Sequence, residues 1–364
     1  MIESGLTKML KNQKIPVIQA IVAAALFGAS TPLSKVLLEE IEPIPLAAFL
    51  YIGSGLFALL LLIFQHRKLV PGDVEAELRR SDIPWLTGAL LAGGVAAPIV
   101  LLFSLLNTPA STASLLLNFE CVATTLIAAL VFLESIDRRI WFAIALLTLA
   151  SILLTWNVAS EWGFSFGALG ILGACILWGM DNNFTRNISA KNPLTIVAVK
   201  GLGAGSFSLI LSYVLGSTFP STNNIISAMV LGGLSYGLSI ILFVLSLRDL
   251  GTTRTTAYFS TAPFFGAMLS LILFRENIGF VFIVSIVIMI AGVFLLVGEK
   301  HQHLHYHQTI LHEHRHHHDD LHHVHTQRVI PHSRFHSHLH QHDKVEHNHA
   351  HAPDLHHRHL HNKS

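Results

Sequence analysis

Two sets of residues in this chain have the types and spacing to bind cations or to exchange protons. The larger set is histidine: 24 of the 25 histidines lie in residues 301–364, many of them at every second position. Imidazole titrates near a pH of about 6.5, so at pH 7 much of this segment is neutral and offers nitrogen ligands to borderline transition metals. The smaller set is Glu120, Asp181 and Lys200, which stand in otherwise apolar sequence.

The histidine-rich segment predicts metal binding by composition rather than by a defined geometry. A structural zinc site has fixed ligand spacing, whereas these ligands are redundant and spread out. Few large apolar residues accompany them, so we expect a disordered tail that binds several nickel, cobalt or zinc ions loosely, with no required cofactor. The alternative is a dispensable low-complexity tail. The candidate ligands are His301, His303, His305, His307, His316, His317, His318, His336, His338, His340, His342, His347, His349 and His351.

The composition of the chain points to a membrane protein. Hydrophobic residues make up 52% of the sequence and charged residues only 12%, although the tail is polar. The net charge of +1 leaves no basic domain that could neutralise phosphates, so we expect no nucleic-acid partner. The two cysteines, Cys121 and Cys175, lie in apolar runs and provide no disulfide framework.

Ten apolar runs have the length of a membrane span, which is about 20 residues for a hydrocarbon core about 30 Å thick. The predicted fold class is therefore an all-α membrane protein, with the first span retained rather than cleaved as a signal peptide. Several connections are very short, which makes neighbouring spans antiparallel. The runs are approximately 16–38, 44–64, 84–106, 110–133, 139–156, 165–184, 194–216, 225–246, 255–274 and 278–298.

Basic residues of the connections predict the orientation. With the N-terminus inside, the outer connections carry only Lys35 and Arg275. The chain is then a multi-pass protein of the cell membrane, an inner membrane in a bacterium, with both termini and the histidine tail in the cytoplasm. The inner connections carry Lys8, Lys11, Lys14, Arg67, Lys68, Arg79, Arg80, Arg138, Arg139, Arg186, Lys191, Arg248, Arg254 and Lys300.

The apolar part of the chain repeats itself. Residues 104–134 align without gaps on residues 246–276, and Phe27-Gly28 matches Trp178-Gly179. Each half holds five spans, an odd number, so the second half is inserted upside down. Inverted repeats of this kind are typical of secondary transporters, with the binding site near the midplane between the halves. We therefore divide the chain into a first repeat (1–156), a second repeat (157–299) and the tail (300–364).

The ten-span pattern, the two five-span halves and the acidic residues that close spans four and nine (Glu134 and Glu276) resemble the EamA-domain members of the drug/metabolite transporter superfamily. The resemblance covers roughly residues 15–298. Asn118-Phe119-Glu120 in span four is similar to one EamA branch in which acidic and asparagine residues stand where many relatives have proline. The second half keeps that proline as Pro263, and the first has Cys121 at the matching position.

Glu120 is the strongest candidate for transport chemistry. A charged residue at the centre of a span costs about 2.5–3.5 kcal/mol on insertion scales. An ionisable residue at such a position therefore indicates a functional site. Glu120 could bind a cation directly, or it could take up a proton as it releases a cation. The alternative is a structural ion pair or a protonated, hydrogen-bonded carboxyl group.

Four further residues could belong to the same site. Lys200 could neutralise Glu120 or Asp181, or extend to the inner surface. Asp181 and Asn182 offer oxygen ligands at a cytoplasmic mouth, or simply end a helix. A regular helix places Asn118 and Glu120 on nearly opposite faces, so we expect Asn118 to bond a neighbouring helix unless span four is unwound.

The sequence predicts a secondary transporter that exports a divalent transition metal, nickel or cobalt and alternatively zinc, in exchange for protons. Histidine-rich relatives associated with nickel and cobalt resistance support that substrate by resemblance. The second hypothesis is export of an organic metabolite, with the tail acting only as a metal buffer or sensor. The expected partners are the lipid bilayer and a metal ion or small-molecule substrate, and a homodimer is compatible with the pattern. No nucleophile–base pair is recognisable, so we expect no enzyme activity.

Overall fold

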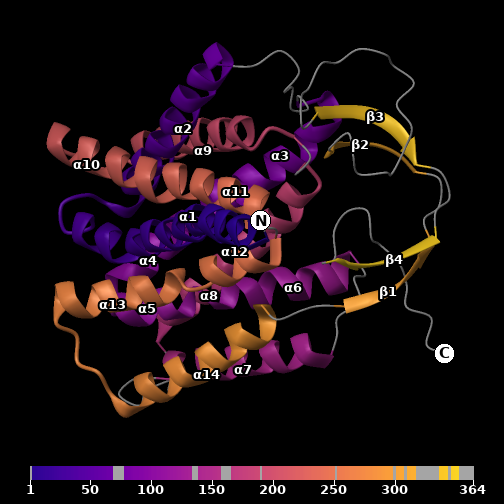
Figure 1. The fold of residues 1–364 in the computed structure, drawn as a ribbon. Coiled ribbons are helices and arrows are strands. Elements are labelled where there is room, and N and C mark those ends of the chain that lie inside the picture. Colours follow the sequence, from indigo (N-terminus) through magenta and orange to yellow (C-terminus); the bar gives the residue numbers. More distant parts are fainter. Residues whose placement is uncertain are drawn as a thin grey trace.

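The computed structural model describes the backbone of most of the chain, and the apolar body within it is helical (Figure 1). In the first half the elements are α1 (Ile2–Leu37), α2 (Pro43–Lys68), η1 (Arg80–Asp82), α3 (Ile83–Ala89), η2 (Leu90–Ala96), α4 (Ala97–Leu106), α5 (Ala110–Leu116), α6 (Phe119–Val131) and α7 (Arg138–Thr155). The described residues are 2–68, 78–132, 138–156, 165–188, 191–250, 252–297, 301–306, 310–316, 336–342 and 346–351.

The second half follows the same order. Its elements are α8 (Phe166–Arg186), α9 (Pro193–Val214), α10 (Thr222–Gly232), η3 (Gly233–Leu238), α11 (Ser239–Leu250), α12 (Thr252–Phe259), α13 (Ala262–Phe274) and α14 (Phe280–Val297).

The helices confirm an all-α membrane protein. Eight helical segments within the described residues are long and apolar enough to cross a bilayer, and Phe280–Leu296 is a shorter apolar helix. α8 has 21 residues but ends in the polar stretch Asp181–Arg186. The count of ten spans therefore stays a prediction. Apart from α1, which begins at Ile2 rather than near residue 16, the helices begin and end close to the predicted bounds.

The two halves interrupt their helices at matching places. The third helical segment of each half contains a π-helical turn, η2 in the first and η3 in the second. The fourth is broken in two, between α5 and α6 at residues 117–118 and between α12 and α13 at residues 260–261. These positions agree to within one residue when Ser104 is aligned with Ser246. Interrupted helices inside a membrane protein are typical of substrate-binding regions.

The halves pack together through equivalent helices. α2 lies along α9 and α7 lies along α14, toward opposite edges of the bundle in Figure 1. The α2–α9 contact is so close that a Cβ atom on Gly201 would lie 2.6 Å from the backbone nitrogen of Gly55, and glycine at this position makes the approach possible. The predicted match of Gly28 with Gly179 also has a structural counterpart. A Cβ on Gly28 would lie 2.1 Å from the Ala262 carbonyl oxygen, and one on Gly179 would lie 2.9 Å from the Thr124 nitrogen.

The described segments of the tail form strands, whereas its composition predicts disorder. β1 (His301–Tyr306) pairs antiparallel with β4 (Glu346–His351), and β2 (Ile310–His316) pairs antiparallel with β3 (His336–His342). The alternation of histidine with other residues has the two-residue period of a strand, which is the physical reason for this backbone. The register places His303 opposite His349 and His314 opposite His338. The candidate ligands His307, His317 and His318 lie outside the described residues.

One polar contact joins the connections of the two halves at one end of the bundle. Glu42, just before α2, accepts hydrogen bonds from the Thr218 hydroxyl group (2.6 Å) and the Thr218 backbone N–H (3.1 Å). The Thr218 hydroxyl, followed by its N–H, lowers the pKa of the Glu42 carboxyl group because both donors stabilise the ionised form.

We expect Glu42→Gln to lower the melting temperature of the purified protein slightly at neutral pH. Because the pKa of Glu42 is lowered in the folded state, the ionised carboxylate contributes stability at pH values above the ordinary glutamate pKa of 4.5. This contribution is lost as the pH falls through the lowered pKa. Melting curves in detergent from neutral to acidic pH check it. The wild-type and variant curves should converge on the acidic side, and a difference that persists or grows there would contradict the assignment. Thr218→Val removes the hydroxyl donor to Glu42 and should lower the melting temperature in the same way as Glu42→Gln.

Candidate transport site

Glu120 lies in the first turn of α6, directly after the break in span four. The side-chain nitrogen Nδ2 of Asn182, on α8, donates a hydrogen bond of 2.8 Å to Glu120 Oε1 and lies 3.1 Å from Thr124 Oγ1. Asn182 is exposed and Glu120 is partly exposed. Span four of the first half and span six of the second half therefore meet at an accessible carboxylate that is held by a neutral amide.

Lys200 is bound to Asp181. Its Nζ lies 2.5 Å from Asp181 Oδ1 and 2.8 Å from Oδ2, and it is 3.4 Å from Thr185 Oγ1. The side chains of Lys200 and Asp181 are only 17% and 10% exposed. Of the sequence alternatives, neutralisation of Asp181 is the one that the structure shows. Asp181 and Asn182 thus have different surroundings although they are adjacent, and only Asn182 contacts Glu120.

The Asp181 carboxylate lies against the π-helical turn η2. A Cβ on Gly93 would lie 1.9 Å from Asp181 Oδ2, so only glycine leaves room for the carboxylate. The Gly93 carbonyl oxygen accepts hydrogen bonds from the Tyr51 hydroxyl group (2.7 Å) and from Trp178 Nε1 (3.0 Å). In a π-helix this carbonyl would bond the N–H five residues later, but that residue is Pro98, which has none.

Aromatic side chains continue from this carbonyl toward the second half. Tyr51 stacks on Tyr236 of η3 with ring centroids 5.8 Å apart, and Phe27 meets Tyr236 edge-on at the same separation. The sequence analysis did not select Tyr51, Trp178 or Tyr236. The available signal was the proline five residues after Gly93, which leaves a carbonyl inside a span in need of donors.

Asn118 lies outside this cluster. It is buried, and its side-chain nitrogen donates to the Leu115 carbonyl oxygen (3.1 Å) and lies 3.8 Å from the sulfur of Met289 on α14. Span four is indeed interrupted beside Asn118, but the side chain bonds its own turn and a neighbouring helix, as expected for the regular-helix case.

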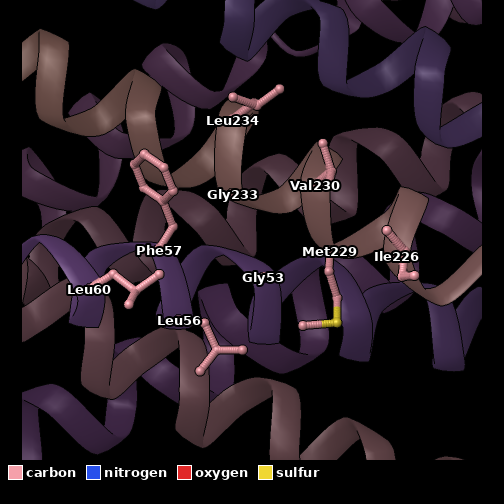
Figure 2. Close-up of a pocket in the computed structure, with 9 residues that line it drawn as sticks. All are labelled: Gly53, Leu56, Phe57, Leu60, Ile226, Met229, Val230, Gly233 and Leu234. Atoms are coloured by element: carbon pink, nitrogen blue, oxygen red, sulfur yellow. The ribbon is translucent and has the colours of Figure 1, made fainter.

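The described part of the helical body contains no preformed metal-binding site. Within the residues that the structure describes, no group of three or more His, Cys, Asp or Glu side chains could hold a metal ion. A pocket of about 410 Å³ between α2 and α10–η3 is apolar throughout and contains no ionisable side chain (Figure 2). It is lined by Gly53, Leu56, Phe57, Leu60, Ile226, Met229, Val230, Gly233 and Leu234.

A bundle of apolar helices in two equivalent halves, with charged and aromatic groups gathered between them, defines a multi-pass membrane transporter. The chain belongs to the EamA-like transporter family, which matches residues 14–156 and 165–298. An uncharacterized transporter of Methanothermobacter thermautotrophicus is 29% identical over 295 residues, which are 77% of this chain and 85% of that protein. The family match indicates transport of a small molecule across a lipid bilayer rather than catalysis.

A solved structure shares the fold. A crystal structure of a protein superposes with a TM-score of 0.55 and 16% sequence identity, over 76% of this chain and 95% of the other. At this identity the likeness concerns the fold alone.

We expect removal of either partner of the Lys200–Asp181 pair to destabilise the protein, by about 3–5 kcal/mol, because the remaining charge is buried without its counter-ion. Lys200→Met and Asp181→Asn test the two single changes, and the double variant should recover most of the stability. Melting temperatures of the four proteins in detergent form the double-mutant cycle. Additive losses in the double variant would show that the pair contributes no coupling energy.

Proposed function

We propose that this protein is a proton-coupled secondary exporter of a divalent transition metal, nickel or cobalt and alternatively zinc. The observation that carries the proposal is the division of charge between two neighbouring carboxylates. Lys200 is bound to Asp181, whereas the donor to Glu120 is the uncharged amide of Asn182. The charge of Glu120 is then available for a proton or for a cationic substrate.

Competition at Glu120 would couple the two fluxes. An ionised carboxylate inside a span is costly, so it favours a bound proton or cation over an empty site. A cation that leaves is replaced by a proton, and Asn182, the donor to Glu120, is exposed at the surface of the helix bundle. The inverted repeat supplies two equivalent ends for alternating access.

The tail supports the metal as substrate. Its 24 histidines bind borderline divalent metals, and in the proposed topology, with both termini cytoplasmic, they lie at the side from which an exporter loads. The repeats of residues 1–156 and 157–299 would form the carrier, and residues 300–364 would raise the local metal concentration. The tail ligands, His301 to His351, thus serve delivery rather than translocation.

An organic metabolite is the second candidate, and the aromatic side chains favour it. Tyr51, Trp178 and Tyr236 lie beside the charged groups, and such rings bind organic cations and flat apolar groups. The described body also lacks a cluster of three metal-ligating side chains. In this case the tail would act only as a metal buffer or sensor.

We expect Glu120→Gln to abolish proton-driven metal uptake into inverted vesicles, because the amide keeps the shape of the side chain and removes its charge. Uptake of Ni²⁺, Co²⁺ and Zn²⁺ under an imposed pH gradient measures it, with Glu42→Gln as a control that removes a carboxylate at the far connection. Normal uptake by Glu120→Gln would remove Glu120 from the mechanism. Wild-type vesicles that collect none of the three metals but accumulate an organic cation would favour the second candidate.

Deleting residues 301–364 should leave transport intact but raise the metal concentration for half-maximal uptake, since redundant ligands concentrate metal without forming the pathway. Protonated imidazole cannot bind metal, so this advantage should fade as the pH falls from about 7.5 to below about 6. The same vesicle assay, run across metal concentration and pH, compares the two proteins. Identical concentration dependence at pH 7.5 would reduce the tail to a buffer, and complete loss of uptake would place it in the pathway.

A further inference from the structure

A carboxylate of the second half caps a helix of the first half at one end of the bundle. Glu276 Oε1 accepts a hydrogen bond of 2.7 Å from the Ala110 N–H, and Oε2 accepts from the Ser111 N–H (3.0 Å) and the Ser111 hydroxyl group. These N–H groups belong to the first turn of α5, where the helix has no backbone acceptors for them and its dipole attracts negative charge. The contact therefore joins span nine to span four.

The backbone turns sharply to bring Glu276 to this position. α13 ends at Phe274, and Arg275 adopts a left-handed conformation with φ of 49°. A non-glycine residue in this region costs about 1–2 kcal/mol. The cap on α5 is the contact that this turn makes possible.

Lys35 completes the contact from a third element. Its Nζ donates to the Thr108 carbonyl oxygen in the turn between α4 and α5, and its charge interacts with that of Glu276. The end of α1, the start of α5 and the end of α13 are thus held together by one acid, one base and the N-terminus of a helix. We call this group, Lys35, Glu276 and the first turn of α5, the α5 latch.

The two ends of the bundle differ in packing although the repeat makes them equivalent. α5 lies against α13 and α1, whereas in the described part of the chain α12, its counterpart, is not packed along α6 and α8 in the corresponding way. Ser114 on α5 is 1% exposed, while Thr256, the aligned residue of α12, is exposed. The side chain of Ser114 is therefore enclosed by the helices around the α5 latch, whereas that of Thr256 is not enclosed.

The repeat places the same residue types at the other end. Continuing the alignment of Gly28 with Gly179 places Arg186 at the position of Lys35, and the alignment of the fourth and ninth spans places Glu134 at the position of Glu276. Glu134 lies outside the described residues. The sequence thus carries an acid and a base twice, once in each half.

We infer that the α5 latch is the gate that keeps this end of the transport pathway closed, and that it must open for the substrate to leave. α5 has only seven residues and is separated from α6 by the break at residues 117–118, so it can move without the helix that carries Glu120. The gate goes beyond the proposed function, because it rests on the family's transport activity and on neither the metal nor the proton.

Cysteine accessibility tests the gate in the full-length protein. Ser114→Cys reports on the latched end and Thr256→Cys on the other end, each in a background with Cys121→Ala and Cys175→Ala. A membrane-impermeant thiol reagent is applied to right-side-out and inverted vesicles. We expect Glu276→Gln to raise the labelling rate of the Ser114 reporter about tenfold and to lower that of the Thr256 reporter. Lys35→Gln should act in the same direction with a smaller effect.

The paired reporters separate gating from loss of structure. A loosened or partly unfolded protein would label faster at both positions, whereas a shift of the gate moves the two rates in opposite directions. Glu134→Gln, which removes the aligned carboxylate of the first half, is the matched control and should not raise Ser114 labelling. Unchanged Ser114 labelling in Glu276→Gln would overturn the inference, as would faster labelling at both reporters or an equal gain in Glu134→Gln.

Discussion

The structure depends on one constraint: groups inside a bilayer cannot rely on water for their hydrogen bonds. A backbone group that lacks its helical hydrogen bond, or a charged side chain, must therefore find a partner in the protein. The Gly93 carbonyl illustrates it. Pro98 has no N–H to donate at the position where a π-helix would supply one. The Tyr51 hydroxyl group and the Trp178 indole N–H donate to the Gly93 carbonyl oxygen instead. Those two side chains come from α2 and α8, so satisfying one carbonyl also joins three elements. The break in span four has a local partner as well, since Asn118 bonds the carbonyl of Leu115.

The same constraint separates the roles of the two carboxylates. A buried ion pair is stable only when both charges are compensated, and the bidentate contact of Lys200 with Asp181 meets that condition. Glu120 receives a hydrogen bond from a neutral amide and remains partly exposed. Removal of one partner of the Lys200–Asp181 pair would leave a buried charge uncompensated, whereas the hydrogen-bond donor to Glu120 carries no charge.

The two halves share their helix interruptions but differ in their charged residues and in part of their packing. The π-helical turns and the broken spans recur at closely matching positions, yet the carboxylate of the candidate transport site does not. Glu120 aligns with Ala262, so the carboxylate occurs in one half only. The packing of α5 and α12 also differs, although their sequences are equivalent by the repeat. The repeat therefore sets where the helices of both halves are interrupted, but not which side chains meet beside the interruptions.

The sequence by itself determined the helical class, the internal repeat and the residues at which most helices begin and end. These properties follow from local rules, because the hydrocarbon thickness sets the span length and glycine pairs tolerate close backbone approach. The sequence also selected Glu120, Asp181, Asn182, Lys200 and Asn118 as candidates for a transport site. Only the tertiary structure decided which carboxylate Lys200 binds, that Asn182 reaches Glu120, and that Glu276 caps α5. Helical periodicity defines the face of the helix on which a residue lies. It does not define the rotation and depth at which two helices meet, and those two quantities select the partners.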